Sequence, residues 1–242
     1  MHKNFTLPRQ AIGQELIEFG CLQLKKQKER VPAATKKNLQ TLAAVLRKIK
    51  NEGLPSCFII KKLPRKLGHG LFLKCRAKPI YRGETIAPYS GKVFIAPQSE
   101  GDGSDYAFAL IADLHLSKEV QKTWDPKRRF SPKRRYSIDL DAEKVGNFTR
   151  FINHSEHPNV EARLVRIPSN SLGLEPSPFE LLYIAKKTIH PGEQLLVCYE
   201  GDDKSYWGAL GIKPFEMDAR TFLLSDEPMN LVSKEVQLQN NS

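Results

Sequence analysis

Three short segments, far apart in the chain, set polar groups or glycines against apolar runs. Asn153 and His154 follow the apolar stretch 145–152, a second run ends in Tyr199, and a glycine pair opens the strand-like segment 67–72. An amide or imidazole buried beside apolar residues costs free energy unless hydrogen bonds satisfy it. The three segments therefore predict one site that is assembled from distant parts of the chain.

Length and composition favour one large domain, with or without a small helical appendage. The chain has 242 residues, and no apolar run approaches the roughly 20 residues that span a membrane. The first residues lack the apolar core and cleavage site of a secretory signal peptide, so we expect none. The cysteines Cys21, Cys57, Cys75 and Cys198 form no closely spaced pair. They predict free thiols in a reducing compartment rather than a zinc cluster or a disulfide framework.

The positive charge is concentrated in the N-terminal arm. The net charge is +11, of which residues 1–55 hold +7 and residues 56–242 hold +4. A basic arm of this kind predicts an acidic partner, such as nucleic acid, a nucleic-acid complex or an acidic protein surface. It is equally compatible with a solvated helix face, and the sequence leaves the two interpretations open.

The N-terminal arm predicts two helices, because apolar residues recur at helical spacing over 9–30 and 36–50. Thr35 is expected to cap the second helix, and Gly53 to end it. A unit of about 55 residues is too small for a sturdy core of its own. Its apolar stripes must therefore pack against the following domain or against a second copy of the chain.

From residue 57 the pattern changes to short apolar strands separated by glycine and proline. We expect strands at 57–61, 71–75, 85–89, 92–95, 106–110, 136–139, 162–165, 179–184 and 194–199, with one short helix in 141–151. This pattern predicts a mainly β fold of several small sheets with flanking helices. The expected domains are a basic helical region at 1–55, a β-rich domain at 56–204, and a closing segment and tail at 205–242.

Residues 111–135 interrupt the strands and are expected to form a loop or insertion. Six of the nine residues from Lys127 to Arg135 are basic. Such a patch is typical of nuclear-import signals and of phosphate contacts, and also of loops that are simply solvated. The sequence does not decide among these interpretations.

Four motifs, taken in order, resemble the SET domain of protein-lysine methyltransferases over about residues 66–207. They are G-x-G-L-F at 68–72, G-E-x-I-x-x-Y-x-G at 83–91, I-D, G-N and R-F-x-N-H-S-x-x-P-N within 138–159, and I-x-x-G-E through the tyrosine at 189–199. Each motif alone is weak, whereas their order is specific. The closest resemblance is to the bacterial branch of chlamydia-like intracellular bacteria, in which Gly-Asp-Asp is followed by Tyr-Trp, here Gly201–Asp203 and Tyr206–Trp207.

The resemblance implies small curled sheets with a knot-like crossing, in which the C-terminal segment threads beneath the Asn-His segment. It also implies that S-adenosylmethionine binds on one face and that the substrate lysine enters a narrow channel from the other. The methyl transfer would need an uncharged amine held in line with the sulfur–methyl bond. Tyr199 is implied to fix the amine near the carbonyls at 152–153, and Tyr89 to line the lysine channel.

The same resemblance implies a set of cofactor-binding residues. They are Gly68, His69, Gly70, Arg150, Asn153, His154, Tyr206 and Trp207. The two glycines would let the backbone approach the cofactor closely. No role is expected for the His69 side chain itself, and Arg150 is expected to form mainly structural hydrogen bonds.

Several positions depart from the family pattern. Cys198 stands where aspartate often precedes the final tyrosine, and Glu156 stands where cysteine often follows Asn-His-Ser. The cysteine-rich flanking modules are absent, so residues 205–224 are expected to close the cofactor site. The apolar residues for this are Trp207, Leu210, Ile212, Phe215 and Phe222. The resemblance implies that the position two before the final tyrosine helps to limit how many methyl groups are added. Val197 is small there, so we expect more than one methyl group to be added. Asp202 and Asp203 are expected to attract a Lys-rich tail.

The leading interpretation is an S-adenosylmethionine-dependent protein-lysine methyltransferase without a metal. Its expected substrate is a Lys-rich protein, either a bacterial histone-like protein or a host histone, in the bacterial cytoplasm or, after export, in a host nucleus. Nucleic-acid contact through the basic regions and a homodimer through the N-terminal helices are further expectations. The alternative is a non-catalytic chromatin or nucleic-acid binding protein with a vestigial core. A cysteine hydrolase using Cys198 and His154 is disfavoured, because Cys198 lies within a strand.

Overall fold

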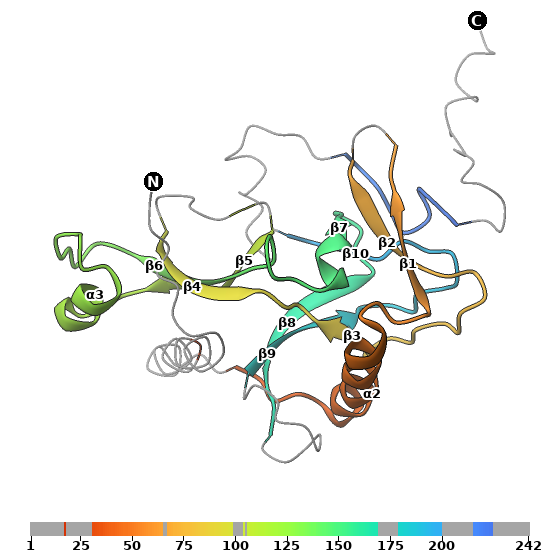
Figure 1. The fold of residues 1–242 in the computed structure, drawn as a ribbon, viewed down its shortest axis with the longest axis horizontal. Helices are drawn as coiled ribbons and strands as arrows, with labels where there is room; N and C mark the ends of the chain where they lie inside the picture. Colours follow the sequence, from red (N-terminus) through yellow and green to blue (C-terminus); the bar gives the residue numbers. More distant parts are fainter. Residues whose placement is uncertain are drawn as a thin grey trace, which may run out of the picture.

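The computed structural model describes residues 17, 31–64, 67–98, 104, 106–168, 179–199 and 215–224. Figure 1 shows small sheets with two described helices at their margins. The elements are α2 (Lys36–Glu52), β1 (Phe58–Lys62), β2 (His69–Leu73), β3 (Thr85–Pro88), β4 (Lys92–Pro97), β5 (Ala107–Leu114), α3 (Lys118–Trp124), β6 (Tyr136–Asp141), the 3₁₀ turn η1 (Phe148–Phe151), β7 (Asn153–His154), β8 (Val160–Arg166), β9 (Phe179–Ala185) and β10 (Leu196–Val197). The mainly β fold of small sheets is therefore confirmed.

The largest sheet has five strands in the order β3-β9-β8-β10-β7. β8 and β9 pair antiparallel along their full lengths, and β3 extends this pair by pairing with β9. β10 lies between β7 and β8 and is parallel to both. The other sheets are the hairpin β1-β2 and the three-stranded sheet β4-β6-β5.

Helix α2 packs on the five-stranded sheet, so its apolar stripe is covered by the same chain. Leu42 is fully buried in a cluster with Leu182 and Ile184 of β9. The capping box is formed by Thr35, whose hydroxyl oxygen accepts from the Asn38 backbone N–H at 3.1 Å. Gly53 ends the helix with a φ of 69°, a conformation that glycine adopts without strain. Both predicted helix ends are thus confirmed.

The interruption between the strands is shorter than the sequence predicted. Residues 111–114 continue β5, and Lys118–Trp124 form helix α3 rather than a loop. The β pattern was missed because the buried Ile111 and Leu114 are three residues apart, which is not the two-residue spacing of a regular strand, and the pairing register shifts between them. Ile17 is buried in the same cluster, so at least one residue of the N-terminal arm belongs to the core of this sheet. The rest of the helix predicted at 9–30 lies outside the described residues.

Two other predictions at the crossing needed correction. The strand predicted at 194–199 is reduced to Leu196–Val197, because Gln194 instead bridges to Phe72 of β2. The helix predicted within 141–151 is a single 3₁₀ turn, and Val145 is 59% exposed instead of joining the apolar run. In the part of the chain that the structure describes, no helix is both long enough and apolar enough to cross a bilayer.

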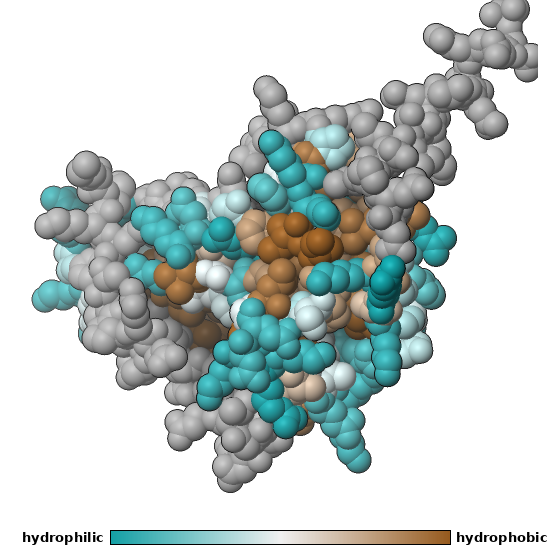
Figure 2. Space-filling model, turned by 45° about the vertical axis from the view of Figure 1, so that its right-hand side comes forward, coloured by the Kyte–Doolittle hydropathy of each residue, from teal (hydrophilic) through white to brown (hydrophobic). Residues whose placement is uncertain are grey.

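The described surface also separates apolar from hydrophilic side chains. In the view of Figure 2, the larger group of apolar side chains lies near the centre, with a smaller group to its left and hydrophilic side chains around both. Several large hydrophobic side chains remain exposed, among them Tyr106, Phe130 and Tyr199.

Candidate functional site

The crossing places Tyr199 beside the Asn153–His154 pair, as the sequence predicted. The Tyr199 hydroxyl donates to the Ile152 carbonyl oxygen at 3.0 Å, and its backbone N–H donates to His154 Nδ1 at 3.1 Å. The two rings lie 5.4 Å apart between centroids. The phenol is therefore held at the site by both its backbone and its hydroxyl, although the residue is 39% exposed.

Backbone pairing explains why these distant residues meet. Leu196 pairs with Asn153 and Val197 pairs with His154, so β10 brings Tyr199 into register with the pair. The fully buried Asn159 holds the same segment from the side of β8. Its Nδ2 donates to the Gln194 carbonyl and its Oδ1 accepts from the Leu196 N–H, both at 2.8 Å. A carboxamide is needed here because it is a donor and an acceptor at once.

A group of buried tyrosines lies next to Tyr199. Tyr89 is 7% exposed and donates its hydroxyl to the Tyr106 carbonyl at 2.6 Å. Tyr183 of β9 lies 5.4 Å from Tyr89 between ring centroids, and it interacts electrostatically with both Tyr89 and Tyr199. The sequence analysis missed Tyr183, although one residue with a polar tip in the aliphatic strand 181–185 was a usable signal.

Both buried phenols stay neutral at physiological pH. Burial raises the pKa of Tyr183 well above its usual value, and the nearby Tyr199 and Tyr89 phenols raise it further. Burial also raises the pKa of Tyr89, followed by the effect of the Asp141 carboxylate. The two phenols next to Tyr199 are therefore neutral aromatic rings with polar hydroxyl groups.

The two positions of the opening motif are occupied by glycine for different structural reasons. Gly68 has a φ of +74° with open space where a Cβ would lie, so its backbone conformation favours glycine. At Gly70, a Cβ would lie 2.6 Å from Gln194 Nε2. The space expected for a close cofactor approach at Gly70 is therefore filled, on the Cβ side, by the Gln194 side chain. The binding roles of these glycines stay predictions.

Gln194 was not predicted as a site residue, and its side chain is unusual. It is fully buried, and neither its Oε1 nor its Nε2 has a hydrogen-bond partner. Its backbone N–H donates to the Ala219 carbonyl at 3.0 Å, so it lies between β2 and residues 215–224. A polar residue at an apolar strand position was the available signal in the sequence.

His69 and Arg150 hold the surrounding backbone. The His69 carbonyl accepts from Asn153 Nδ2 at 3.0 Å, while its side chain is exposed and lies edge-on to Phe151. Arg150 donates from Nη1 to the carbonyls of Ala142 and Glu143, at 3.3 and 3.0 Å. Its guanidinium also lies over the rings of Tyr106 and Phe151. The structural hydrogen bonds expected of Arg150 are thus present.

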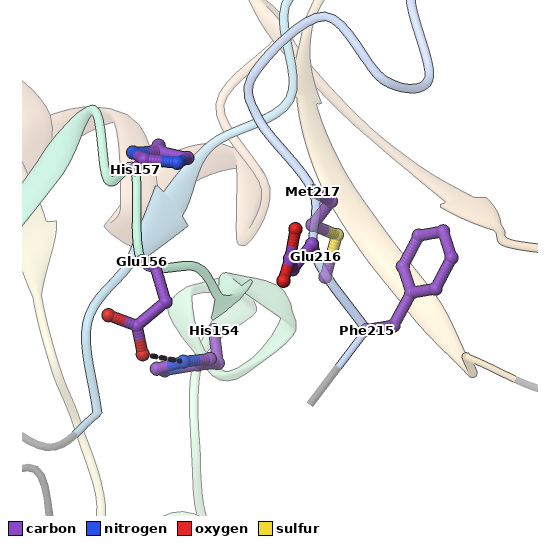
Figure 3. A pocket seen from close by; sticks show the side chains of 6 residues that line it. All are labelled: His154, Glu156, His157, Phe215, Glu216 and Met217. Carbon is purple, nitrogen blue, oxygen red and sulfur yellow. Dashed lines mark ion pairs between the residues drawn. The ribbon is translucent and has the colours of Figure 1, made fainter. Parts of the chain in front are cut away.

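A small cavity opens beside His154 (Figure 3). It measures about 170 Å³ and is lined by His154, Glu156, His157, Phe215, Glu216 and Met217. His154 Nδ1 accepts from Tyr199, which leaves the proton on Nε2, 3.4 Å from Glu156 Oε1. Both ring nitrogens are thus engaged, which argues against a role as the base of a cysteine hydrolase. Within the described residues, no three His, Cys, Asp or Glu side chains converge as metal ligands would.

Residues 215–224 pack against one side of this region, and their closing of a cofactor site stays a prediction. Ser155 donates its hydroxyl to the Met217 carbonyl, and Leu224 N–H donates to the Gly192 carbonyl at 2.9 Å. Phe215 and Phe222 stack with their centroids 6.2 Å apart. The other residues predicted to close the site or attract substrate lie outside the described residues: Asp202, Asp203, Tyr206, Trp207, Leu210 and Ile212.

Comparisons with known proteins agree with this architecture. The family model of the SET domain matches residues 68–200. A curated relative is the histone-lysine N-methyltransferase, H3 lysine-9 specific SUVH1 of Nicotiana tabacum, which is 29% identical over 127 residues. The match covers 52% of this chain and only 16% of that relative.

Solved structures of ATXR5 are similar in fold. One is a complex with mono-methylated histone H3.1 and the other a complex with di-methylated histone H3. Each match covers 73% of this chain and 72% of that chain at 19% identity, with TM-scores of 0.51 and 0.50. At this identity the likeness concerns the fold alone.

Proposed function

Because the chain belongs to the SET domain family, whose model matches more than half of its 242 residues, we propose that it is a protein-lysine N-methyltransferase that uses S-adenosylmethionine. One observation carries the proposal: the Tyr199 hydroxyl is held on the Ile152 carbonyl beside the Asn153–His154 pair. The crossing thereby collects a phenol, a carbonyl oxygen, a carboxamide and an imidazole at one place.

The cavity beside His154 supports the cofactor assignment. Its volume of about 170 Å³ is below the roughly 300–1,000 Å³ typical of pockets for drug-sized ligands, so it suits one end of the cofactor. Its imidazole, phenyl and thioether groups suit a flat ring, and its carboxylates can accept hydrogen bonds from an amino group. His154 and Phe215–Met217 would hold the adenine end, and Asn153 with the backbone of 68–70 the methionine end.

When bound, S-adenosylmethionine would supply a methyl group on a positively charged sulfur: a nitrogen–carbon bond to the uncharged amine would form as the carbon–sulfur bond breaks in line, and the neutral thioether S-adenosylhomocysteine would leave. The chain's part is to position that amine and to keep it uncharged. The Tyr199 hydroxyl and the Ile152 carbonyl would orient the nitrogen, while the neutral rings of Tyr89 and Tyr183 pack the lysine stem. Burial among uncharged groups disfavours the ammonium form of the substrate and so favours the reactive amine.

We expect more than one methyl group to be added to the substrate lysine. Val197, two positions before Tyr199, is small and fully buried against β7 and β8. A small residue there leaves room around the nitrogen. Mass spectrometry that finds only monomethyl product across a full time course would contradict this expectation.

The proposed substrate is a Lys-rich protein, such as a bacterial histone-like protein or a host histone. The name of the SUVH1 relative and the histone in the ATXR5 complexes support the choice of a histone-like tail. Membership of the chlamydia-like bacterial branch, with action in the bacterial cytoplasm or a host nucleus, belongs to the same proposal. A homodimer through the N-terminal arm also belongs to it, although the apolar stripe of α2 is already covered by β9.

The decisive experiment compares two tyrosine variants in a labelled-cofactor assay with a Lys-rich protein. Tyr199→Phe removes only the hydroxyl at the site, so methyl transfer should fall by about 100-fold or more. Tyr81→Phe is the matched control, since Tyr81 is 56% exposed, and it should keep full activity. Binding of S-adenosylhomocysteine, measured by calorimetry, should be similar in both variants.

Two outcomes would reject the proposal. Equal activity of Tyr199→Phe and the wild type would show that the phenol hydroxyl has no role in methyl transfer. A wild-type chain that binds nucleic acid but transfers no label to any Lys-rich protein would instead support the non-catalytic alternative with a vestigial core.

A further inference from the structure

The segment from α3 to the start of β6 is the most basic part of the chain outside the N-terminal arm. Residues 118–135 contain eight basic and two acidic residues, a net charge of +6, whereas residues 56–242 as a whole hold +4. Figure 1 places α3 at the outer end of the three-stranded sheet, away from β1 and β2. This segment, called here the basic loop, is therefore a local concentration of positive charge at one end of the molecule.

The basic loop is held in place by a buried polar network. Gln121 is 1% exposed and donates from Nε2 to the Tyr136 hydroxyl at 2.5 Å. That hydroxyl donates to Asp125 Oδ2 at 3.2 Å, and Gln121 Oε1 accepts from the Ser131 N–H at 3.3 Å. A loop with its own buried hydrogen bonds presents its side chains in a defined arrangement.

Among the basic side chains of the loop, the less exposed Arg128 and Arg134 form ion pairs with Asp125. Asp125 Oδ2 lies 3.5 Å from Arg128 Nε and 3.8 Å from Arg134 Nη1. The six other basic side chains are exposed, namely Lys118, Lys122, Lys127, Arg129, Lys133 and Arg135. Glu119 is the single exposed acidic residue of residues 118–135. The outward surface is thus almost wholly basic.

A groove on this surface lies beside a buried guanidinium nitrogen that makes no hydrogen bond. It measures about 460 Å³ and is lined by Gln98, Ser131, Lys133, Arg134 and Arg135. Arg134 Nη1 is buried and makes no hydrogen bond, because Asp125 is too far away. Buried donors of this kind are normally satisfied, and a phosphate oxygen is the acceptor that best suits a guanidinium.

We propose that the basic loop binds the phosphate backbone of nucleic acid. Interfaces between proteins have an apolar core and are depleted in lysine, whereas nucleic-acid interfaces are polar and strongly positive. The exposed surface of this loop has several lysines and arginines but a single large exposed apolar side chain, Phe130. This composition favours nucleic acid over an acidic protein.

The inference gives the proposed methyltransferase a way to reach its substrate, and to that extent it rests on the proposed function. A Lys-rich tail is repelled by the basic loop, so this surface is distinct from the substrate site. Binding to DNA would instead place the enzyme beside Lys-rich proteins that are already bound to DNA. Binding through phosphates alone implies no sequence preference and a strong dependence on salt.

The test measures binding of the full chain to DNA of mixed sequence by fluorescence anisotropy over a salt series. The loop variant removes four outward charges that lie outside the Asp125 network, through Lys127→Ala, Arg129→Ala, Lys133→Ala and Arg135→Ala. The control variant removes four exposed charges from other elements, through Lys61→Ala, Lys62→Ala, Lys186→Ala and Lys187→Ala. Both variants lose the same net charge, so a difference between them reports position.

The loop variant should bind DNA with an affinity lower by about 10-fold or more. The slope of its log affinity against log salt concentration should fall by the equivalent of up to about four phosphate contacts. The control variant should stay within about threefold of the wild type. Equal losses in the two variants, wild-type binding by the loop variant, or binding to polyglutamate in place of DNA would each overturn the inference.

Methyl transfer provides the separate readout for the proposed function. The loop variant should methylate a free Lys-rich peptide at the wild-type rate and a DNA-bound Lys-rich protein more slowly. Loop-dependent DNA binding without any methyl transfer would reject the proposed function and leave the inference standing. Normal methyl transfer with loop-independent DNA binding would overturn the inference and leave the proposed function standing.

Discussion

Single residues in this chain are explained by their nearest neighbours rather than by motif alone. Gly70 belongs to a motif whose glycines are expected to admit a cofactor, yet its missing Cβ leaves room for the Gln194 side chain. Gln194 itself is buried without hydrogen bonds to its carboxamide. The two residues therefore form one packing unit across β2 and the segment before β10.

Gly70→Ala should destabilise the fold by about 1–3 kcal/mol, the usual effect of overpacking. The new methyl group would meet Gln194 Nε2 at 2.6 Å. In a Gln194→Ala background the same change should be much less destabilising, because the clashing group is gone. Urea unfolding of the four chains of this double-mutant cycle checks the coupling, and strict additivity would contradict it.

Asp139 in β6 should make stability depend on pH. Burial raises its pKa to about 6 from the usual 3.8, and the nearby Asp141 carboxylate adds to this rise while a hydrogen bond from Ser137 opposes it. The folded state then binds the proton more tightly than the unfolded state. This contribution is fully present below about pH 4 and is lost as the pH rises through about 6.

Asp139→Asn should therefore stabilise the chain at neutral pH, by at most about 3 kcal/mol. The variant should unfold at a urea concentration that varies less between about pH 4 and about pH 7 than that of the wild type. Asp113→Asn is the control, since Asp113 is exposed. A wild-type stability that rises over this range in proportion to Asp139 ionisation would refute the assignment.

At the scale of elements, α2 shows how a local signal and a tertiary contact agree. Its cap residues and helical spacing were visible in the sequence, whereas its partner was not. The structure shows that Leu42 packs against β8 and β9, so the N-terminal helix shares a core with the strands that reach the site. The prediction of a boundary after residue 55 stays untested.

Leu42→Ala should destabilise the chain by about 2–5 kcal/mol, because Leu42 is fully buried and leaves a cavity. Leu223→Ala removes the same atoms from a side chain that is 45% exposed, and it should cost less than about 1 kcal/mol. Thermal unfolding of the two variants compares them directly. Similar losses would mean that α2 contributes little to the stability of the sheet.

At the scale of the whole molecule, the crossing decides whether a site exists. β10 contains only two residues, yet it joins β7 and β8 and carries Tyr199 to His154. Asn159 supports this join with two hydrogen bonds to backbone groups of the crossing segment. A small number of buried polar contacts therefore organises segments that are about 130 residues apart in sequence, from Gly68 to Tyr199.

Asn159→Ala should destabilise the chain by about 2–4 kcal/mol, since it leaves two buried backbone groups unsatisfied. Asn159→Asp keeps the acceptor for the Leu196 N–H and loses the donor to the Gln194 carbonyl. The aspartate and alanine variants should therefore differ in the rates of amide hydrogen exchange at these two positions. Asn51→Ala, at an exposed position, is the control. An Asn159→Ala chain as stable as the control would show that the crossing needs no such support.

The sequence alone determined the elements and the list of candidates. Periodicity located α2 and most strands, and the ordered motifs selected Tyr199, Asn153 and His154, because spacing and residue type are local properties. It missed α3, although Ser117 was a local N-cap signal for that helix. It also overextended the final strand, whose ends are set by pairing with distant segments. Val145 shows the same limit: it is apolar by type and exposed in the fold.

Only the tertiary structure decided which groups meet. The hydrogen bond from Tyr199 to the Ile152 carbonyl, the Tyr183 phenol beside Tyr89 and the unpaired carboxamide of Gln194 all depend on contacts between distant segments. Such contacts follow from how the sheets pack and cross. No spacing within a single stretch of sequence specifies them.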